Sequence, residues 1–159
     1  FLVENNEYAI SVPQDKQMAV SSAADKACGL GLPGVQVDGT KVFEVYEAVL
    51  EAVECARKGE GATVIEAKMY RLTPHSSDDD DRSYRSREEV EAHKAQDPIL
   101  LGKEQLIAEG LMTEEEYEQL EEKAKAEVDE AVRIATEAPY PKGEDAAFPV
   151  YAEQEVQHG

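Results

Sequence analysis

The chain has no tryptophan, only two cysteines and three histidines, and 16 basic residues against 35 acidic ones. The resulting formal charge of -19 repels phosphate backbones and anionic lipids. We therefore expect no nucleic-acid partner and no membrane partner. Cys28 and Cys55 fall within helical patterns and lack metal-ligand spacing, so we expect small core residues and no disulfide framework.

Long apolar runs are missing as well. No segment approaches the roughly 18 apolar residues of a membrane span, and no signal segment is recognisable. We therefore expect a soluble protein located in the cytoplasm. The first residues, from Phe1, already have the pattern of a buried strand, from which we expect the chain to begin in the middle of a fold.

The 159 residues, 42% of them hydrophobic, provide one core of ordinary size. Three short apolar segments predict strands at 1–3, 35–37 and 63–67, the last continuing to Tyr70, with helical patterns between them. This alternation is typical of an α/β fold, a parallel sheet with helices on both faces.

Two helices are expected between these strands, at 22–30 and 41–58. Thr40 is the expected N-cap of the second. One apolar stripe of this helix is predicted to face the sheet: Val42, Tyr46, Val49, Val53 and Ala56.

The chain after Arg71 is mostly helical in pattern. Capping boxes at Ser86/Glu89 and Thr113/Glu116 predict helices at 87–95 and 114–137. Asp97-Pro98 separates the first of these from a further helix that extends through 106–110. From 139 onward the composition predicts an extended or disordered tail, with a possible extended segment at 148–151.

The loop after the third strand holds the strongest candidate site. Open α/β folds bind ligands at the carboxyl ends of their parallel strands, and this loop contains Arg71 and His75. Arg71 offers a planar set of donors to a phosphate or carboxylate, and His75 can act as an acid, a base or a hydrogen-bond donor. A surface loop rich in turn formers is the alternative. The aspartate run at 78–81 lacks the EF-hand pattern, so we expect it to be solvated.

A second candidate follows the first strand, at Glu4-Asn5-Asn6-Glu7-Tyr8. A carboxamide oxygen and a backbone carbonyl suit Mg²⁺ whose other ligands are phosphates and one acidic side chain. A plain turn is the alternative. His93 and His158 are expected to face solvent.

Four ordered motifs resemble one family: ENNEYAISVP at 4–13, LPGVQVDG at 32–39, ARKGEGATVIEAKMYRLTPHSSDDDDRSYRSREEVE at 56–91, and DPI at 97–99. The family is the alpha subunit of the thiamin-diphosphate-dependent 2-oxo acid dehydrogenase decarboxylase component, and the likeness is greatest to its bacterial branched-chain type. The resemblance implies three parts. Residues 1–85 would be the C-terminal half of the cofactor-binding domain, 86–138 a helical extension and 139–159 the tail.

The resemblance also implies roles for individual residues. The side chain of Asn6 and the backbone carbonyl of Tyr8 would bind Mg²⁺, and Ile10 would line the thiamin diphosphate pocket. Arg71 and His75 would lie near the diphosphate and the reacting thiazolium, with His75 also assisting transfer to the lipoyl group. Ser76 and Ser86 match serines that a kinase modifies in mitochondrial relatives, a regulation that we do not predict here.

Two departures restrict these implications. Glu4 stands where mitochondrial relatives carry an arginine, and the Gly-Asp-Gly end of the cofactor motif, with its acidic metal ligand, is not among the 159 residues. The chain alone is therefore expected to be inactive.

The resemblance implies three partners: a beta subunit that supplies the catalytic glutamate, a second alpha subunit, and the lipoyl-bearing acyltransferase core. Pyruvate or acetoin dehydrogenase is the alternative within the family, although Ser77 and the four aspartates favour the branched-chain type. A non-catalytic acidic helical module that binds a basic partner is the alternative outside it.

Overall fold

The computed structural model describes residues 1–147 and divides the chain into two compact units, with the boundary in sequence between Thr113 and Glu114. The first unit contains β1 Leu2–Asn5, β2 Tyr8–Ala9, β3 Val12–Pro13, α1 Gln14–Gln17, α2 Lys26–Gly29, β4 Gly34–Asp38, α3 Val42–Arg57, β5 Val64–Lys68, the 3-10 helix η1 Asp81–Ser83, α4 Arg87–Lys94 and α5 Pro98–Ala108. The second contains α6 Glu114–Glu137 and the 3-10 helix η2 Gly143–Ala147.

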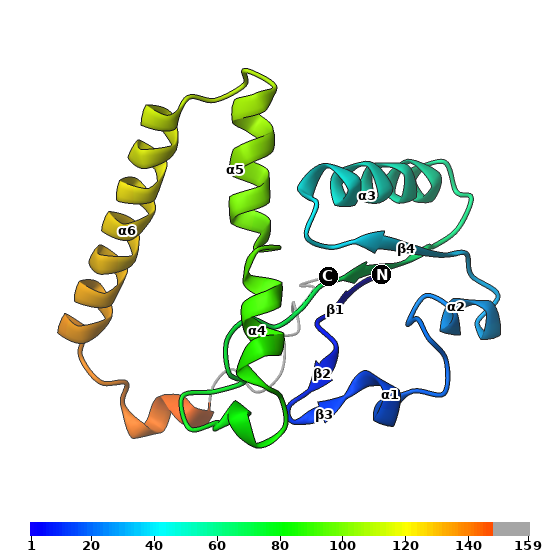
Figure 1. Ribbon diagram of the computed structural model, residues 1–159. Helices are drawn as coiled ribbons and strands as arrows, with labels where there is room; N and C mark the ends of the chain where they lie inside the picture. The colour runs from blue at the N-terminus through cyan, green and yellow to red at the C-terminus, as the bar shows by residue number, and fades with distance from the viewer. Residues whose placement is uncertain (148–159) are drawn as a thin grey trace, which may run out of the picture. The chain divides into compact units, whose positions relative to one another are not determined.

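A three-stranded parallel sheet of order β1-β5-β4 organises the first unit. The central strand β5 is buried from Val64 to Ala67, whereas the two outer strands are only partly covered. Helix α3 lies along one side of the sheet, and α2 packs near β4 on the other side (Figure 1). The α/β prediction is therefore confirmed.

The register of the strands brings their carboxyl ends to one edge. Asn5 of β1 and Asp38 of β4 both lie opposite Lys68 of β5. The third strand ends at Lys68 and does not continue to Tyr70 as predicted. The two loop segments that follow β1 and β5 therefore leave the sheet side by side.

The first predicted helix is much shorter than expected, because only Lys26–Gly29 is helical. The preceding residues form a turn, in which the carboxylate of Asp25 accepts a hydrogen bond from the Ser22 amide at 3.1 Å. The side chain of Ser22 is buried and donates to Glu66 on β5. A tertiary contact therefore replaces the first turn of the predicted helix, residues 22–25.

Helix α3 has the predicted extent but presents a different face to the sheet. Val42 and Tyr46 of the predicted stripe are 52% and 63% exposed. The partly buried positions are Phe43, Val45, Ala48, Val49, Ala52 and Cys55. Thr40 is not the N-cap, because its hydroxyl donates to Asp38 at 2.7 Å.

Cys28 is exposed, so its assignment to the core is wrong, and both cysteines are free.

The predicted starts of the later helices are confirmed where the contacts are described. Ser86 accepts from the Glu89 amide at 3.0 Å, and Asp97 accepts from the Ile99 amide at 2.9 Å. Helix α6 has the predicted bounds. The tail from 139 onward was expected to be extended or disordered, but residues 143–147 form the 3-10 helix η2. The predictions for 148–151 and His158 lie outside the described residues.

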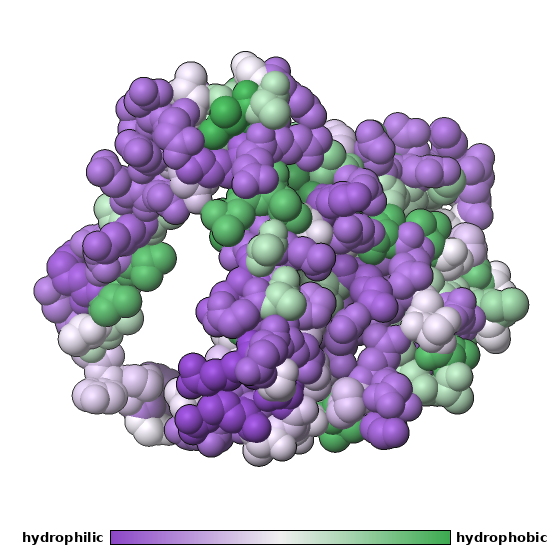
Figure 2. Space-filling view, viewed as in Figure 1, coloured by the Kyte–Doolittle hydropathy of each residue, from purple (hydrophilic) through white to green (hydrophobic). Residues whose placement is uncertain are grey.

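Hydrophilic side chains cover most of the face shown in Figure 2, and hydrophobic ones gather in separate patches. Within residues 1–147 no helix has the length and apolar character needed to cross a membrane.

Gly34, at the start of β4, packs too closely for a side chain. A Cβ there would lie 2.3 Å from the Ala24 carbonyl oxygen and 3.2 Å from the Ala27 Cβ. Gly34→Ala should therefore lower the free energy of unfolding by about 1–3 kcal/mol, measured by urea denaturation. Gly29→Ala is the control, because nothing lies within 4 Å of that position. Equal stability of the two variants would contradict this packing.

Candidate functional site

Arg71 joins the loops that follow β1 and β5. Its Nη2 donates to the Ile10 carbonyl and to the Tyr84 hydroxyl, both at 2.7 Å. Its guanidinium carbon lies 5.6 Å from the centre of the Tyr8 ring. The backbone amide of Arg71 also donates to the Asn6 carbonyl. The two sequence-predicted loops therefore converge, and Arg71 is the side chain that connects them.

Part of the Arg71 guanidinium is left unsatisfied. Its Nε is buried and has no hydrogen-bond partner among the residues that the structure describes. A buried donor without a partner is costly, and guanidinium donors match the oxygens of phosphate and carboxylate. Arg71 therefore has a free donor for an anionic group.

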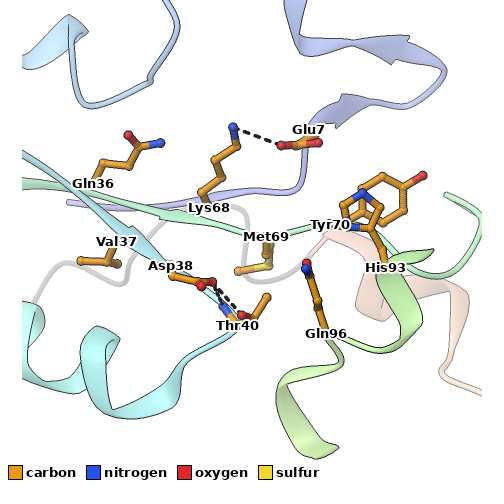
Figure 3. Close-up of a pocket in the computed structure, with 10 residues that line it drawn as sticks. All are labelled: Glu7, Gln36, Val37, Asp38, Thr40, Lys68, Met69, Tyr70, His93 and Gln96. Carbon is orange, nitrogen blue, oxygen red and sulfur yellow. Dashed lines mark hydrogen bonds and ion pairs between the residues drawn. The ribbon is translucent and has the colours of Figure 1, made fainter. Parts of the chain in front are cut away.

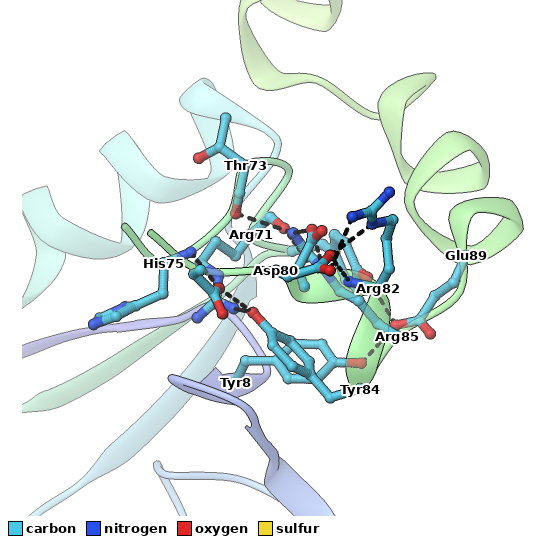
Figure 4. Close-up of polar contacts among 12 residues, drawn as sticks. Tyr8, Arg71, Thr73, His75, Asp80, Arg82, Tyr84, Arg85 and Glu89 are labelled. Carbon is cyan, nitrogen blue, oxygen red and sulfur yellow. Dashed lines mark hydrogen bonds and ion pairs between the residues drawn. The ribbon is translucent and has the colours of Figure 1, made fainter. Parts of the chain in front are cut away.

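Tyr8 and Tyr70 share one acceptor. Both hydroxyls donate to Oε1 of Glu89 on α4 at 2.7 Å, and Figure 4 shows the bond from Tyr8. The two rings meet edge to face with centres 6.0 Å apart. Burial and the hydrogen bond to Glu89 raise the pKa of both tyrosines, while the same two bonds lower the pKa of Glu89. Helix α4 is thus attached to both loops through one carboxylate.

Arg85 holds the second loop from inside. Its side chain is fully buried, and its Nη2 lies 2.6 Å from the Asp81 carboxylate. It also donates to the carbonyls of Arg71 and Thr73. Burial alone would lower the pKa of Arg85, but the bond to Asp81 helps to raise it. A buried, paired cation therefore fixes the backbone that carries Arg71.

The aspartate run is not simply solvated, because three of its members accept hydrogen bonds within the loop. Asp79 accepts from the His75 amide and the Tyr84 hydroxyl, and these bonds lower its pKa. Asp80 accepts from Arg82, and Asp81 from Arg85. The expectation of a solvated run is therefore wrong for Asp79 and Asp81, which are partly buried.

His75 is attached to the loop only through its backbone. Its imidazole is exposed and points away from the tyrosines and arginines in Figure 4. The structure thus brings Asn6, Tyr8, Ile10 and Arg71 together and leaves the His75 ring outside their contacts.

Asn6 and Tyr8 present, in one tight turn, two neutral oxygen atoms that could act as metal ligands. The Asn6 Oδ1 accepts from the Tyr8 amide at 3.1 Å, which leaves it a second lone pair. Tyr8 pairs with Pro13, whose nitrogen carries no hydrogen, so the Tyr8 carbonyl receives no bond from that partner. Within residues 1–147 no group of three or more His, Cys, Asp or Glu side chains could hold a metal. This turn can therefore supply only part of a coordination shell.

A hollow of about 400 Å³ lies beside this turn, at the carboxyl ends of β4 and β5 (Figure 3). Lys68 reaches across to Glu7, with 3.2 Å between Nζ and the carboxylate. Tyr70 stacks on His93, with ring centres 3.9 Å apart. His93 is therefore partly buried, not solvent-facing as predicted.

The sequence predicts Tyr84 and Arg85 as part of the loop that holds the strongest candidate site, but it assigns them no role, and it does not predict Glu89 as a site residue. Glu89 was assigned to a capping box, and only its backbone amide has that role, since its carboxylate binds the tyrosines. The local signal for the other two residues is the Tyr84-Arg85 pair, which follows the aspartate run in the same loop.

Burial and hydrogen bonds to carboxylates raise the pKa values of Tyr8, Tyr70 and Tyr84, so these three should ionise at higher pH than a tyrosine in a model peptide. The fold favours their protonated forms, so this contribution to stability is complete below about pH 10 and is lost as pH rises through the higher folded values. A phenolate absorbance titration should show part of the signal delayed. Glu89→Gln should move some of that part to lower pH, whereas Glu88→Gln, one position earlier on α4, should not. A single transition in the wild-type chain would contradict the cluster.

A family model described as "Dehydrogenase E1 component" matches residues 1–144. The chain is 53% identical over 152 residues to the 2-oxoisovalerate dehydrogenase subunit alpha of Bacillus subtilis, in a match that covers 96% of this chain and 46% of that protein. It is 43% identical over 136 residues to the pyruvate dehydrogenase E1 component subunit alpha of Staphylococcus epidermidis, with 85% and 37% covered.

The third relative is the 3-methyl-2-oxobutanoate dehydrogenase subunit alpha of Mycobacterium tuberculosis, 41% identical over 153 residues, with 96% and 42% covered. The chain spans less than half the length of each of these relatives. The resemblance inferred from the four motifs is confirmed, and the chain belongs to the dehydrogenase E1 component family.

Proposed function

We propose that the chain is part of the alpha subunit of a branched-chain 2-oxo acid dehydrogenase, which decarboxylates its substrate oxidatively and transfers the acyl group to lipoyl. The observation that carries this proposal is the convergence of two loops on Arg71, with a buried Nε free for an anion. The identity of 53% to a 2-oxoisovalerate dehydrogenase subunit, against 43% to a pyruvate dehydrogenase subunit, supports the branched-chain substrate.

The residues of the turn after β1 fit Mg²⁺ and thiamin diphosphate as a partial site. Asn6 Oδ1 and the Tyr8 carbonyl would hold Mg²⁺, a cation that accepts neutral oxygens when phosphates and one carboxylate complete its shell. Arg71 would bind the diphosphate, and Ile10 would lie against the cofactor. Its bound thiazolium would supply the electron sink that decarboxylation requires.

His75 is the proposed proton donor. Its imidazole is exposed and free of the loop contacts, so it can reach a substrate or a lipoyl group without breaking the cluster. Arg85, Asp81 and Asp79 hold its backbone in place. The loop is therefore hydrogen-bonded near His75, and the exposed imidazole can serve as an acid–base group.

The remaining parts of the site would come from other polypeptide segments and subunits. We propose a beta subunit, a second alpha subunit and the acyltransferase core as partners, and a cytoplasmic location. The acidic ligand of Mg²⁺ would lie outside these 159 residues.

The test uses an alpha subunit containing these residues, assembled with its beta subunit, thiamin diphosphate and Mg²⁺. The value of kcat/KM should be about 10-fold or more higher for 2-oxoisovalerate than for pyruvate, because the pocket would be shaped for a branched chain. A preference for pyruvate would favour the alternative within the family. No turnover of any 2-oxo acid in an assembly that retains the beta subunit would favour the non-catalytic acidic module.

His75→Ala in the same assembly should lower kcat for decarboxylation about 100-fold or more, because a positioned acid–base group is lost. Its free energy of unfolding should change by less than about 0.5 kcal/mol, since the ring is exposed and makes no contact in the cluster. Ser77→Ala, two positions along the same loop, is the control and should keep its turnover. Unchanged turnover in His75→Ala would remove His75 from the reaction.

A further inference from the structure

Glu66 is a fully buried acid on the central strand of the sheet. Its Oε1 accepts from the Asn5 side-chain amide at 2.5 Å. Its Oε2 accepts from the Ser22 hydroxyl and, at 3.4 Å, from the Ala24 amide. Burial alone would raise the pKa of Glu66, but these donors together lower it, so the carboxylate is ionised at neutral pH.

An ionised carboxylate can only accept hydrogen bonds, which fixes the orientation of the Asn5 amide. The Asn5 nitrogen must face Glu66, and it also donates to Gln14 Oε1 at 2.8 Å. The Asn5 oxygen is thereby directed the other way, where it accepts from the Glu7 amide at 3.1 Å. Glu66 therefore decides which end of the Asn5 amide meets the turn.

The bond from Asn5 to Glu7 holds an unfavourable backbone conformation. Glu7 has a φ of 68°, in the left-handed region that residues other than glycine rarely adopt. This conformation bends the chain between Asn6 and Tyr8, and the Asn6 side-chain oxygen accepts from the Tyr8 amide. The two proposed Mg²⁺ donors, Asn6 Oδ1 and the Tyr8 carbonyl, thus belong to a turn whose geometry depends on Asn5.

A ring of hydrogen bonds closes this arrangement. Gln14 donates to the Ser21 carbonyl at 2.7 Å, and its backbone amide donates to the Glu7 carbonyl at 2.9 Å. Ser21 precedes Ser22, which returns to Glu66. The two oxygens of Glu66 therefore serve different neighbours, with Oε1 acting on the turn at 5–8 and Oε2 on the turn at 22–24.

We propose that Glu66 is a positioning residue for Mg²⁺ binding, which acts by orienting the Asn5 amide so that the 5–8 turn presents its two oxygens. The inference rests on the proposed function, because it assumes that this turn binds Mg²⁺ with thiamin diphosphate. Glu66 has no bond to the two proposed Mg²⁺ ligands, Asn6 Oδ1 and the Tyr8 carbonyl oxygen. It acts on them through Asn5 and Glu7.

The experiment measures Mg²⁺ affinity of the assembled alpha and beta subunits by calorimetry in the presence of thiamin diphosphate, together with kcat and the KM for Mg²⁺. Glu66→Gln should weaken Mg²⁺ binding about 10- to 100-fold, because the substituted amide can turn its own N–H donor toward Asn5. The KM for Mg²⁺ should rise in parallel, whereas kcat at saturating Mg²⁺ should stay near that of the wild type.

Two further variants separate positioning from general stability. Ser22→Ala removes a bond to Oε2 and leaves Oε1 on Asn5, so it should lower the melting temperature without changing Mg²⁺ affinity. Asn5→Asp combined with Glu66→Gln restores one donor facing one acceptor, and it should recover most of the lost affinity. If Glu66→Gln does not fold, Asn5→Ala tests the same link and should weaken Mg²⁺ binding equally.

The Mg²⁺ affinities of these variants separate three outcomes. Wild-type affinity in folded Glu66→Gln or Asn5→Ala would overturn the role of Glu66 while leaving the proposed function intact. An equal loss of affinity in Ser22→Ala would also overturn it, since the effect would then be one of stability. A wild-type assembly that binds no Mg²⁺ with thiamin diphosphate would instead overturn the proposed function, and the role of Glu66 with it.

Discussion

The parallel pairing of β1 with β5 is the constraint on which the rest of the first unit depends. Its register sets Asn5 opposite Lys68, so the two following loops leave the sheet at the same edge. The amide of Met69 then donates to the Asn5 carbonyl, and that of Arg71 to the Asn6 carbonyl. Without this register the side chain of Arg71 could not reach Ile10, and no common site would form.

Charged groups hold the two loops where an apolar core is thin. Glu66 and Arg85 are buried and hydrogen-bonded, whereas the buried apolar side chains are few and mostly small. A buried charge that loses its partner is costly, so such networks favour one arrangement over its near alternatives. In the part of the chain that the structure describes, Glu66 and Arg85 make these bonds beside a small set of buried apolar residues: Ala24, Ala27, Val64, Ile65 and Ala67.

The contacts between the loops and α4 show how one residue can have two roles. The backbone amide of Glu89 donates to the Ser86 N-cap of the helix, and its carboxylate accepts from the hydroxyls of Tyr8 and Tyr70. The capping pattern predicted the helix correctly because it depends on residues three positions apart. The same pattern misassigned the carboxylate, because its partners lie 81 and 19 positions away.

The sequence by itself determined the α/β class, the start of helices α4 and α5, the extent of α6 and the family, because each depends on local spacing or on an ordered set of motifs. It also indicated the residues of both loops. Only the tertiary structure decided the buried face of α3, the loss of the helix at 22–25, the outward direction of His75 and the junction of Glu66 with Asn5. The physical reason is that a side chain chooses its partner from the residues that the folded sheet brings near it. Glu66 and Asn5, 61 positions apart, meet only once β1 and β5 are paired.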